Sequence, residues 1–235
     1  MAEKKITRKE LLNEPDEFIT FSGRAIGYVR ENPRYAGFAA LVVIACLAAG
    51  VVYSSYRSHR QSTSHDLFVQ ASRDYEEAVN GTEPASEEKL NKLFDRFDGI
   101  ARDYGSLPAG EMALLYSGYV LSKKKDYKGA LERYLKLESS RLAEEGLRDL
   151  FWYSVARTHM ALKEYDKAAG IFDTLSKDTK SPYRREAYGA IARIYEFKDK
   201  KKEAVQAYRQ YLKIFPEAPD AAFVKARIAE LTARG

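Results

Sequence analysis

The chain has 235 residues, of which 45% are hydrophobic, so it can bury a core of ordinary size. Its net charge of +5 is spread thinly, because residues 1–34 hold seven Lys/Arg against six Asp/Glu and the residues after Tyr56 hold 32 against 28. Nucleic-acid-binding domains usually concentrate basic residues on one face, so we expect no nucleic-acid partner. The single cysteine excludes an internal disulfide bond and a Cys/His metal cluster.

The first 34 residues predict a short tail that contains an amphipathic helix. Apolar residues recur at helical spacing from Phe18 to Val29. Such a stripe suits a lipid surface or the membrane helix of a partner. A solvated helix that only leads into the next segment is an open alternative.

Residues 35–56 predict a transmembrane helix. The segment carries no charged residue, and its 22 residues span about 33 Å as a helix, which matches the hydrocarbon thickness of a bilayer. Tyrosines bracket the segment, where aromatic rings favour the headgroup boundary, and Arg34 and Arg57 close it on the two sides. A buried core helix seldom runs this long without a charge.

Two processing alternatives concern the same segment. A cleaved signal peptide has a short basic leader, whereas 34 residues of mixed charge precede this stretch. The run from Val43 to Cys46 resembles a degenerate lipoprotein cleavage box, but the chain stays apolar as far as Val52. We therefore interpret Cys46 as a small hydrophobic side chain within the membrane, with lipidation as the alternative.

Basic residues near the span predict its orientation. Arg24, Arg30 and Arg34 precede it, and Arg57 and Arg60 follow it. Short segments rich in Lys and Arg tend to stay in the cytoplasm. We therefore expect a cytoplasmic N-terminus and an exported C-terminal domain.

Beyond residue 64 the sequence shows helical periodicity and no strand alternation of any length. Three segments align, each with a helix, a short polar turn and a second helix. Each second helix carries an alanine followed four residues later by an aromatic residue: Ala130 and Tyr134, Ala168 and Phe172, Ala204 and Tyr208. The alanines are 38 (168 − 130) and 36 (204 − 168) residues apart, which indicates a repeat of helical hairpins.

This pattern resembles the tetratricopeptide repeat family, whose motif recurs about every 34 residues. The matching positions are a small residue at the helix crossing (Gly118, Ala156, Ala192), an early bulky residue (Leu114, Trp152, Tyr188) and an aromatic residue after the turn (Tyr127, Tyr165). In the third repeat Lys201 replaces that aromatic residue, and only this repeat ends on a proline, Pro216. The resemblance implies an all-α fold in which the transmembrane helix precedes an α-solenoid of helical hairpins.

The expected division is a tail (1–34), a transmembrane helix (35–56) and a repeat domain (57–235). Within that domain we expect a degenerate first hairpin (64–107), three repeats (111–140, 149–182 and 185–218) and a capping helix (220–232). No Gly or Pro lies between Gly50 and Gly81, so the membrane helix is expected to run on into the first solenoid helix.

The sequence carries no recognisable catalytic or cofactor-binding motif. His59, His65 and His159 show no metal-ligand spacing, no nucleophile lies in a known motif, and the glycines form no phosphate-binding loop. We therefore expect a protein that is not an enzyme, with no catalytic residue, cofactor, metal ion or small-molecule substrate.

In the tetratricopeptide family the first helix of each repeat lines the concave surface. The resemblance therefore implies a protein-binding groove formed by Met112, Tyr119, Tyr153, Arg157, Met160, Glu186, Arg193, Glu196 and Phe197. Leu115 and Leu150 share such positions, but we expect them to pack between repeats. Arg157 and Arg193 occupy the same repeat position and are expected to point the same way. The Lys and Asn residues of chaperone-tail-binding grooves are missing, which disfavours an acidic chaperone tail as the ligand.

Lysines also cluster in two turns, at residues 123–125 and at residues 198 and 200–202. Solvated turns are the simplest interpretation. An acidic partner or anionic lipid headgroups are the alternatives.

The layout resembles the single-span ancillary subunit of the bacterial Sec translocon, which links the channel to periplasmic chaperones. This implies a scaffold or adaptor anchored in the inner (plasma) membrane, with a periplasmic repeat domain. Its partners would be other proteins, such as the translocon or periplasmic chaperones. A scaffold for outer-membrane assembly or cell division, and a regulatory subunit of a membrane enzyme, are the alternatives. The sequence leaves the oligomeric state open.

Overall fold

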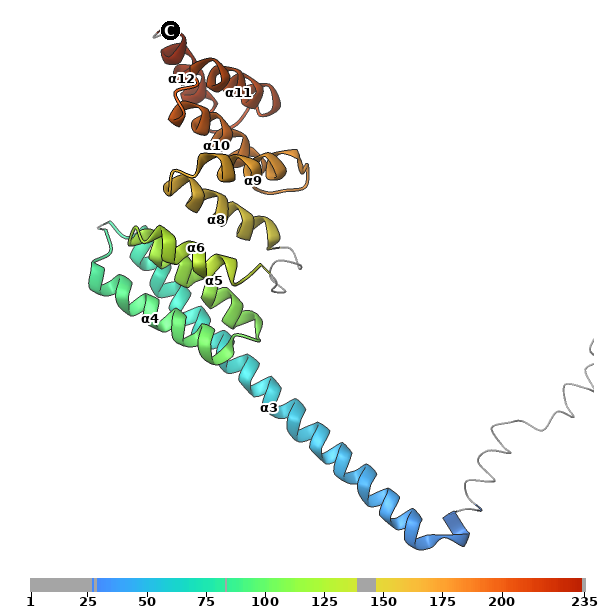
Figure 1. The fold of residues 1–235 in the computed structure, drawn as a ribbon. Helices are drawn as coiled ribbons and strands as arrows, with labels where there is room; N and C mark the ends of the chain where they lie inside the picture. The colour runs from blue at the N-terminus through green and yellow to red at the C-terminus, as the bar shows by residue number, and fades with distance from the viewer. Residues whose placement is uncertain (1–26, 28, 83, 139–146, 234–235) are drawn as a thin grey trace, which may run out of the picture. The chain divides into compact units, whose positions relative to one another are not determined.

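The computed structural model describes residues 27, 29–82, 84–138 and 147–233, and every regular element in these ranges is an α-helix (Figure 1). The all-α class predicted from the sequence is therefore confirmed. The chain divides into two compact units, Met1–His59 and Arg60–Gly235. Each unit is described by itself below.

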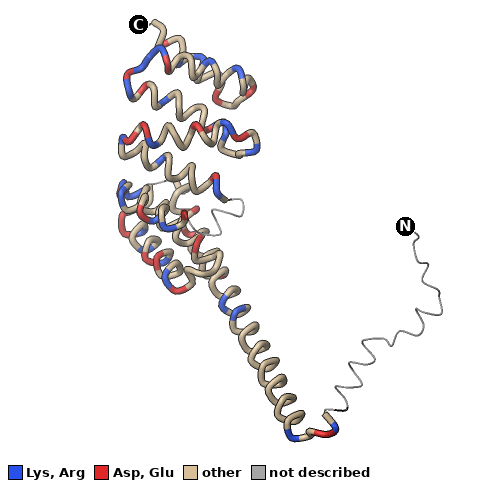
Figure 2. The backbone as a smooth tube through the Cα atoms, turned by 45° about the vertical axis from the view of Figure 1, so that its right-hand side comes forward, with Lys and Arg blue, Asp and Glu red and all other residues tan. Residues whose placement is uncertain are grey.

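The first unit contains the N-terminal part of helix α3, whose bounds are Pro33–Asn80. From Tyr35 to Tyr56 this helix carries no Lys, Arg, Asp or Glu, as the unbroken tan stretch in Figure 2 shows. By length and composition α3 can cross a membrane, and none of its most apolar window is buried. The transmembrane helix stays a prediction. The amphipathic helix predicted in the tail lies almost entirely outside the described residues.

The second unit is a solenoid of helical hairpins stacked in chain order (Figure 1). Beyond the C-terminal part of α3, its helices are α4 (Glu87–Tyr104), α5 (Pro108–Lys123), α6 (Tyr127–Leu135), α8 (Arg148–Ala161), α9 (Tyr165–Lys177), α10 (Arg184–Phe197), α11 (Lys201–Ile214) and α12 (Ala221–Ala233). The hairpins expected from the repeat pattern correspond to α5 with α6, α8 with α9 and α10 with α11. Helix α12 packs on α11 at the C-terminal end.

The first hairpin of the solenoid joins the end of α3 to α4. Ala71 and Ala78 of α3 share one buried cluster with Leu93 and Phe97 of α4. Ser86 begins α4, as its side chain accepts a hydrogen bond from the backbone N–H three residues later at 3.2 Å. This is the helix start that a serine followed by two glutamates predicts.

Small residues set the distance between paired helices. Gly118 of α5 lies against the ring of Tyr134 on α6, and a Cβ atom added to Gly118 would lie 2.4 Å from that ring. The equivalent residues of the next two hairpins, Ala156 and Ala192, are completely buried. The repeat alanines and aromatic residues of the second helices are buried as well. The positions that the repeat pattern assigns to the helix crossings and to the inner face of each second helix are therefore buried in all three hairpins.

The turns inside the three hairpins share one backbone conformation that the sequence pattern did not reveal. Lys125, Lys163 and Asp199 have φ values of 64°, 61° and 55°. In each turn the N–H of the following residue bonds to the carbonyl five residues back, as from Glu164 to His159 at 2.9 Å. This is a Schellman ending, which usually contains glycine. Two lysines and an aspartate occupy the left-handed position here, so the glycine that usually marks such a turn in a sequence is absent.

Candidate functional site

Two neighbouring cavities lie in the second unit, and Tyr153, Arg157 and Ala161 of α8 line both of them. The first, here named the tyrosine cavity, has a volume of about 540 Å³ and lies among α3, α5, α6 and α8. The second, named the carboxylate cavity, has a volume of about 580 Å³ and lies among α8, α9, α10 and α11. Both fall within the size range of ligand pockets. Together they are called the groove below.

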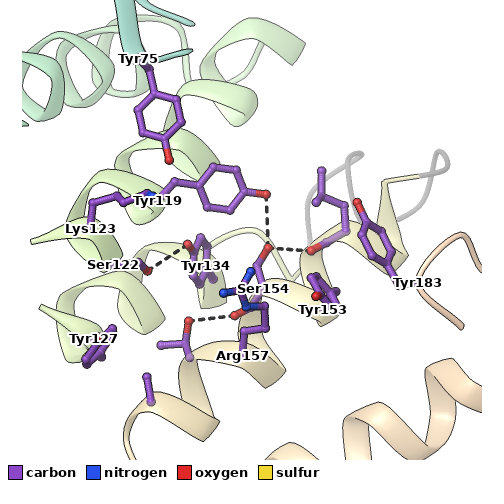
Figure 3. Close-up of a pocket in the computed structure, with 13 residues that line it drawn as sticks. Tyr75, Tyr119, Ser122, Lys123, Tyr127, Tyr134, Tyr153, Ser154, Arg157 and Tyr183 are labelled. Carbon is purple, nitrogen blue, oxygen red and sulfur yellow. Dashed lines mark hydrogen bonds between the residues drawn. The ribbon is translucent and has the colours of Figure 1, made fainter. Parts of the chain in front are cut away.

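The tyrosine cavity takes its name from six lining tyrosines, Tyr75, Tyr119, Tyr127, Tyr134, Tyr153 and Tyr183 (Figure 3). Hydrogen bonds fix some of them. Ser154 donates its hydroxyl proton to the Leu150 carbonyl at 2.8 Å, so Tyr119 is the donor in its 3.3 Å contact with Ser154 Oγ. The hydroxyls of Tyr134 and Ser122 lie 3.4 Å apart. These contacts preorganise the rings without a ligand.

Burial keeps three tyrosines of this cavity, Tyr75, Tyr119 and Tyr134, protonated at physiological pH by raising the pKa of each. Burial, together with the nearby Tyr116, raises the pKa of Tyr75 to about 12. Burial also raises the pKa of Tyr119 and of Tyr134, although their hydrogen bonds to serine hydroxyls oppose this effect. The cavity therefore presents apolar ring faces with O–H groups that can donate to carbonyl or carboxylate oxygens.

Arg157 lies where the two cavities meet. Its guanidinium carbon lies 5.8 Å from the centroid of the Tyr153 ring, and that ring stacks on Tyr183 with centroids 4.5 Å apart and 17° between the planes. The side chain is exposed and has no hydrogen bond or ion pair within the described part of the chain. Stacking thus orients Arg157 while its N–H donors still face solvent.

The carboxylate cavity combines acidic, basic and apolar groups. Oε1 of Glu186 accepts a hydrogen bond from Nη2 of Arg185 at 2.7 Å, and Oε2 is buried without a partner among the described residues. Asp220 accepts a hydrogen bond from the Tyr211 hydroxyl. Phe197 is 58% exposed and stacks on Tyr165 with ring centroids 5.6 Å apart. The cavity can therefore hold both charged and apolar groups.

Seven of the nine residues predicted for the groove line these cavities. Tyr119 lines the tyrosine cavity, and the carboxylate cavity contains Tyr153, Arg157, Met160, Glu186, Arg193 and Phe197. Met112 lines neither, because it packs against the core cluster that holds Leu115. Leu115 is buried as expected, whereas Leu150 also lines the tyrosine cavity.

Glu196 differs from the prediction, because it faces the capping helix rather than the groove. It accepts hydrogen bonds from the Tyr208 hydroxyl at 2.5 Å and from Nε of Arg227 at 2.8 Å, and its side chain is 13% exposed. Burial alone would raise the pKa of Glu196, but these hydrogen bonds outweigh burial and lower it. Glu196 therefore anchors α12 and is not available to a partner.

Several lining residues were not among the nine predicted ones, and three of these lie at or near the starts of helices. Tyr183 precedes α10, Arg185 lies in its first turn, and Asp220 precedes α12. All three lie at or near helix starts, outside the repeat positions that the family motif assigns to the groove. Each enters the groove because consecutive hairpins stack. Their charged or aromatic character was visible in the sequence, but their placement was not.

Other predicted features have structural roles. Nδ1 of His159 lies 2.6 Å from Oε2 of Glu164, beside the repeat turn. Among the described residues no group of His, Cys, Asp and Glu could hold a metal ion. In the lysine-rich turns, Lys124 donates to Asn91 at 2.6 Å and Lys198 to Asp166 at 2.5 Å. These contacts tie neighbouring hairpins together and leave the binding role of the lysines a prediction.

Comparison with known proteins agrees with this architecture. The nearly identical TPR-like repeats of a putative kinesin light chain from Podosopora anserina are 15% identical, with a TM-score of 0.57, over 74% of this chain and 89% of that one. A variant of the same repeats is 16% identical, with a TM-score of 0.57, over 74% and 88%. At this identity the likeness shows a shared fold. No curated protein matches the chain. The family model for the tetratricopeptide repeat-like domain matches residues 32–233, and the chain therefore belongs to that family.

Proposed function

We propose that this protein is an adaptor that binds other proteins in the groove between the tyrosine and carboxylate cavities. Repeat domains of this kind typically bind proteins and are generally not catalysts. The observation that carries the proposal is the placement of Arg157, which lines both cavities and is oriented by the stacked rings of Tyr153 and Tyr183. Buried aromatic residues and arginine are the groups that dominate protein interfaces.

The composition of the groove favours a segment that carries an acidic group beside bulky apolar residues. Arg157 and Arg193 both line the carboxylate cavity, so they can act on one bound chain. Met160 and Phe197 of the same cavity offer apolar contact. An extended or helical segment fits such a surface.

Reversing both groove arginines is expected to abolish partner capture. In the Arg157→Glu, Arg193→Glu variant, two carboxylates replace the groups that attract the acidic residue of the partner. The measurement is co-purification from gently solubilised membranes, followed by mass spectrometry. Both side chains are exposed, so the melting temperature should shift little.

The matched control is the Arg209→Glu, Lys213→Glu variant, which makes the same change of charge on exposed residues of α11 outside both cavities. It should retain the partners. Neutralising the lysines of the two turns should weaken capture only modestly, and more so at low salt. If the arginine pair proves dispensable and the lysines prove essential, the partner binds the two lysine-rich turns and the groove proposal is wrong.

We also propose that the apolar part of α3 anchors the protein in a membrane. Support comes from the 22 residues without charge (35–56) and from the exposure of the side chains there, which a core helix of a soluble protein would bury. The basic residues before the span favour a cytoplasmic N-terminus. The proposed location is the bacterial inner membrane, with the solenoid in the periplasm.

Reporter fusions test this orientation. Alkaline phosphatase fused after Gly235 is expected to be active, because the enzyme folds only in an oxidising compartment, and the same reporter fused after Arg30 is expected to be inactive. Activity is measured in intact cells, with the amount of each fusion checked by immunoblot. The reverse pattern would place the solenoid in the cytoplasm and exclude periplasmic partners.

Within the envelope we propose a role beside the Sec translocon or with periplasmic chaperones. The support is the layout of a short tail, one apolar span and an exported repeat domain. A scaffold for outer-membrane assembly or cell division, and a regulatory subunit of a membrane enzyme, compete with this role. The identity of the proteins whose capture depends on the groove arginines will distinguish these three roles.

A further inference from the structure

The polar side chains that line the tyrosine cavity are mostly hydrogen-bond donors. Arg157 and Lys123 can only donate, and the lining tyrosines carry O–H groups. No Asp, Glu, Asn, Gln or His occurs among the described residues that line this cavity. The carboxylate cavity, by contrast, contains Glu186 and Asp220 beside its arginines. A ligand in the tyrosine cavity therefore finds donors for its oxygen atoms but few acceptors for its N–H groups.

Several of these donors are unused in the structure. Four lining tyrosines make no hydrogen bond with their hydroxyls within the described part of the chain: Tyr75, Tyr127, Tyr153 and Tyr183. All four side chains are partly exposed, and Tyr75 directs its oxygen from α3 into the cavity (Figure 3). A ligand with free oxygen atoms can therefore bind these hydroxyls without breaking a hydrogen bond of the folded chain.

Main-chain oxygens on the walls of the cavity are already engaged. The carbonyl of Ser122 accepts a hydrogen bond from the N–H of Lys125 at 3.1 Å. The carbonyl of Thr158 accepts one from the N–H of Leu162 at 3.0 Å, and that of Ser154 accepts one from the Thr158 hydroxyl at 2.8 Å. An ordinary extended chain brings one N–H per residue, and an N–H that loses water without gaining an acceptor is unfavourable. The cavity therefore favours a chain that lacks N–H groups.

Proline is the residue that keeps its backbone carbonyl and has no N–H. A proline-rich segment adopts the polyproline II conformation, which has no internal hydrogen bonds, so its carbonyls are free to accept from a binding site. Segments of this kind bind grooves lined by aromatic side chains. The rings and the unused O–H groups of the lining tyrosines match the two parts of such a segment.

The dimensions of the cavity set the length of the segment. Tyr153 and Ala161 of α8 both line it and are eight residues apart (161 − 153), which is about 12 Å along a helix axis. Polyproline II rises about 3.1 Å per residue, so about four residues cover this distance. Tyr127 and Tyr183 lie on opposite sides of Arg157 (Figure 3). Aromatic rings are thus present at both ends of the path.

We propose that the tyrosine cavity binds a proline-rich segment of the partner protein in the polyproline II conformation. About four of its residues lie along α8, with proline rings against the tyrosine rings. Its carbonyls accept hydrogen bonds from the unused hydroxyls of Tyr75 and Tyr183, and a flanking Asp or Glu pairs with Arg157. This inference rests on the proposed function and adds the composition and the conformation of the bound segment.

The test begins with selection of random dodecapeptides displayed on phage against the full chain in detergent micelles. The unmodified chain should enrich peptides with two or more prolines within about four residues, beside an Asp or Glu. The Arg157→Gln variant should still enrich proline and lose the preference for the acidic residue.

A synthetic copy of the most enriched peptide tests the contacts. The Tyr75→Phe, Tyr183→Phe variant removes two unused O–H groups and keeps both rings, so it should melt like the unmodified chain and bind the peptide about tenfold more weakly. Tyr195→Phe is the matched control, because it makes the same change on a partly exposed tyrosine outside both cavities, and it should bind normally. Replacing the prolines of the peptide with alanines should weaken binding by about tenfold or more, because alanine restores N–H groups and conformational freedom.

The outcomes distinguish this inference from the proposed function. Enriched peptides that depend on Arg157 but show no excess of proline overturn the inference and leave the groove proposal standing. Equal binding of the alanine peptide, or equal binding by the Tyr75→Phe, Tyr183→Phe variant, has the same consequence. Absence of any enriched peptide, or identical peptides from the unmodified chain and Arg157→Gln, contradicts the proposed function itself. Self-association of the chain that the proline peptide displaces would identify a second copy as the occupant and overturn the inference.

Discussion

The Gly118→Leu variant is expected to lose about 3 kcal/mol of folding free energy, at the upper end of the cost of overpacking a core. A Cβ atom alone would lie 2.4 Å from Cε1 of Tyr134, and Leu adds three further carbon atoms. Tyr134 is only 1% exposed and packs in the buried cluster with Leu115 and Ala130, so displacing its ring would break these contacts. Urea unfolding followed by circular dichroism measures the loss.

The matched control is another helical glycine. Nothing lies within 4 Å of a Cβ atom added to Gly170 of α9. Gly170→Ala should therefore stabilise the protein by about 0.5–1 kcal/mol, because alanine restricts the unfolded chain more than glycine does. Gly118→Ala should still destabilise. If Gly118→Ala and Gly170→Ala shift the midpoint of urea unfolding in the same direction by the same amount, the close contact between Gly118 and Tyr134 is contradicted.

The Arg227→Ala variant is expected to destabilise the capping helix α12 by about 2–3 kcal/mol, because it leaves a largely buried carboxylate without its cation. Arg227 binds Glu196, which is 13% exposed, and Glu230 of its own helix. The substitution should accelerate amide hydrogen exchange more in α12 than in α5. Arg209→Ala on the exposed face of α11 is the control and should change stability by less than about 0.5 kcal/mol.

The same ion pair predicts how the cap responds to acid. The pKa of Glu196 is lowered in the folded chain, since the hydrogen bonds from Arg227 and Tyr208 outweigh its burial. A carboxyl group with a lowered pKa stabilises the fold above its ordinary value of 4.5, and this contribution is lost as the pH falls through the folded-state pKa. Protection of the α12 amides against hydrogen exchange should therefore decline in acid, and the decline should be smaller in the Arg227→Ala variant. An equal decline in both proteins would contradict this role of Glu196.

The features that depend on short-range periodicity could be predicted from the sequence. Ala130 with Tyr134 and the equivalent pairs define the buried face of each second helix, so the repeat register was readable without any tertiary information. Gly118 and Ala156 were readable for the same reason, since only small residues fit at a helix crossing. The fold follows from this regularity, whereas the groove residues were inferred from the family resemblance.

What the sequence did not reveal depends on how consecutive hairpins stack. Tyr183 and Asp220 lie outside the repeat positions, so only the stacked structure brings them to the groove. Glu196 occupies a repeat position that faces the groove in the motif, yet Arg227 of the following helix draws it away. The left-handed turn residues also lacked a signal, because lysine occurs at Lys163 where glycine is usual.

Site-specific photocrosslinking in intact cells tests the central claim most directly. Benzoylphenylalanine placed at Ala161, which is exposed and lines both cavities, should form adducts with partner proteins. The Arg157→Glu, Arg193→Glu background should remove these adducts. The same probe at Gln206, exposed on α11 and outside both cavities, should form none of them. Adducts from Gln206 with none from Ala161 would contradict the account, because the partner would then bind a surface other than the groove.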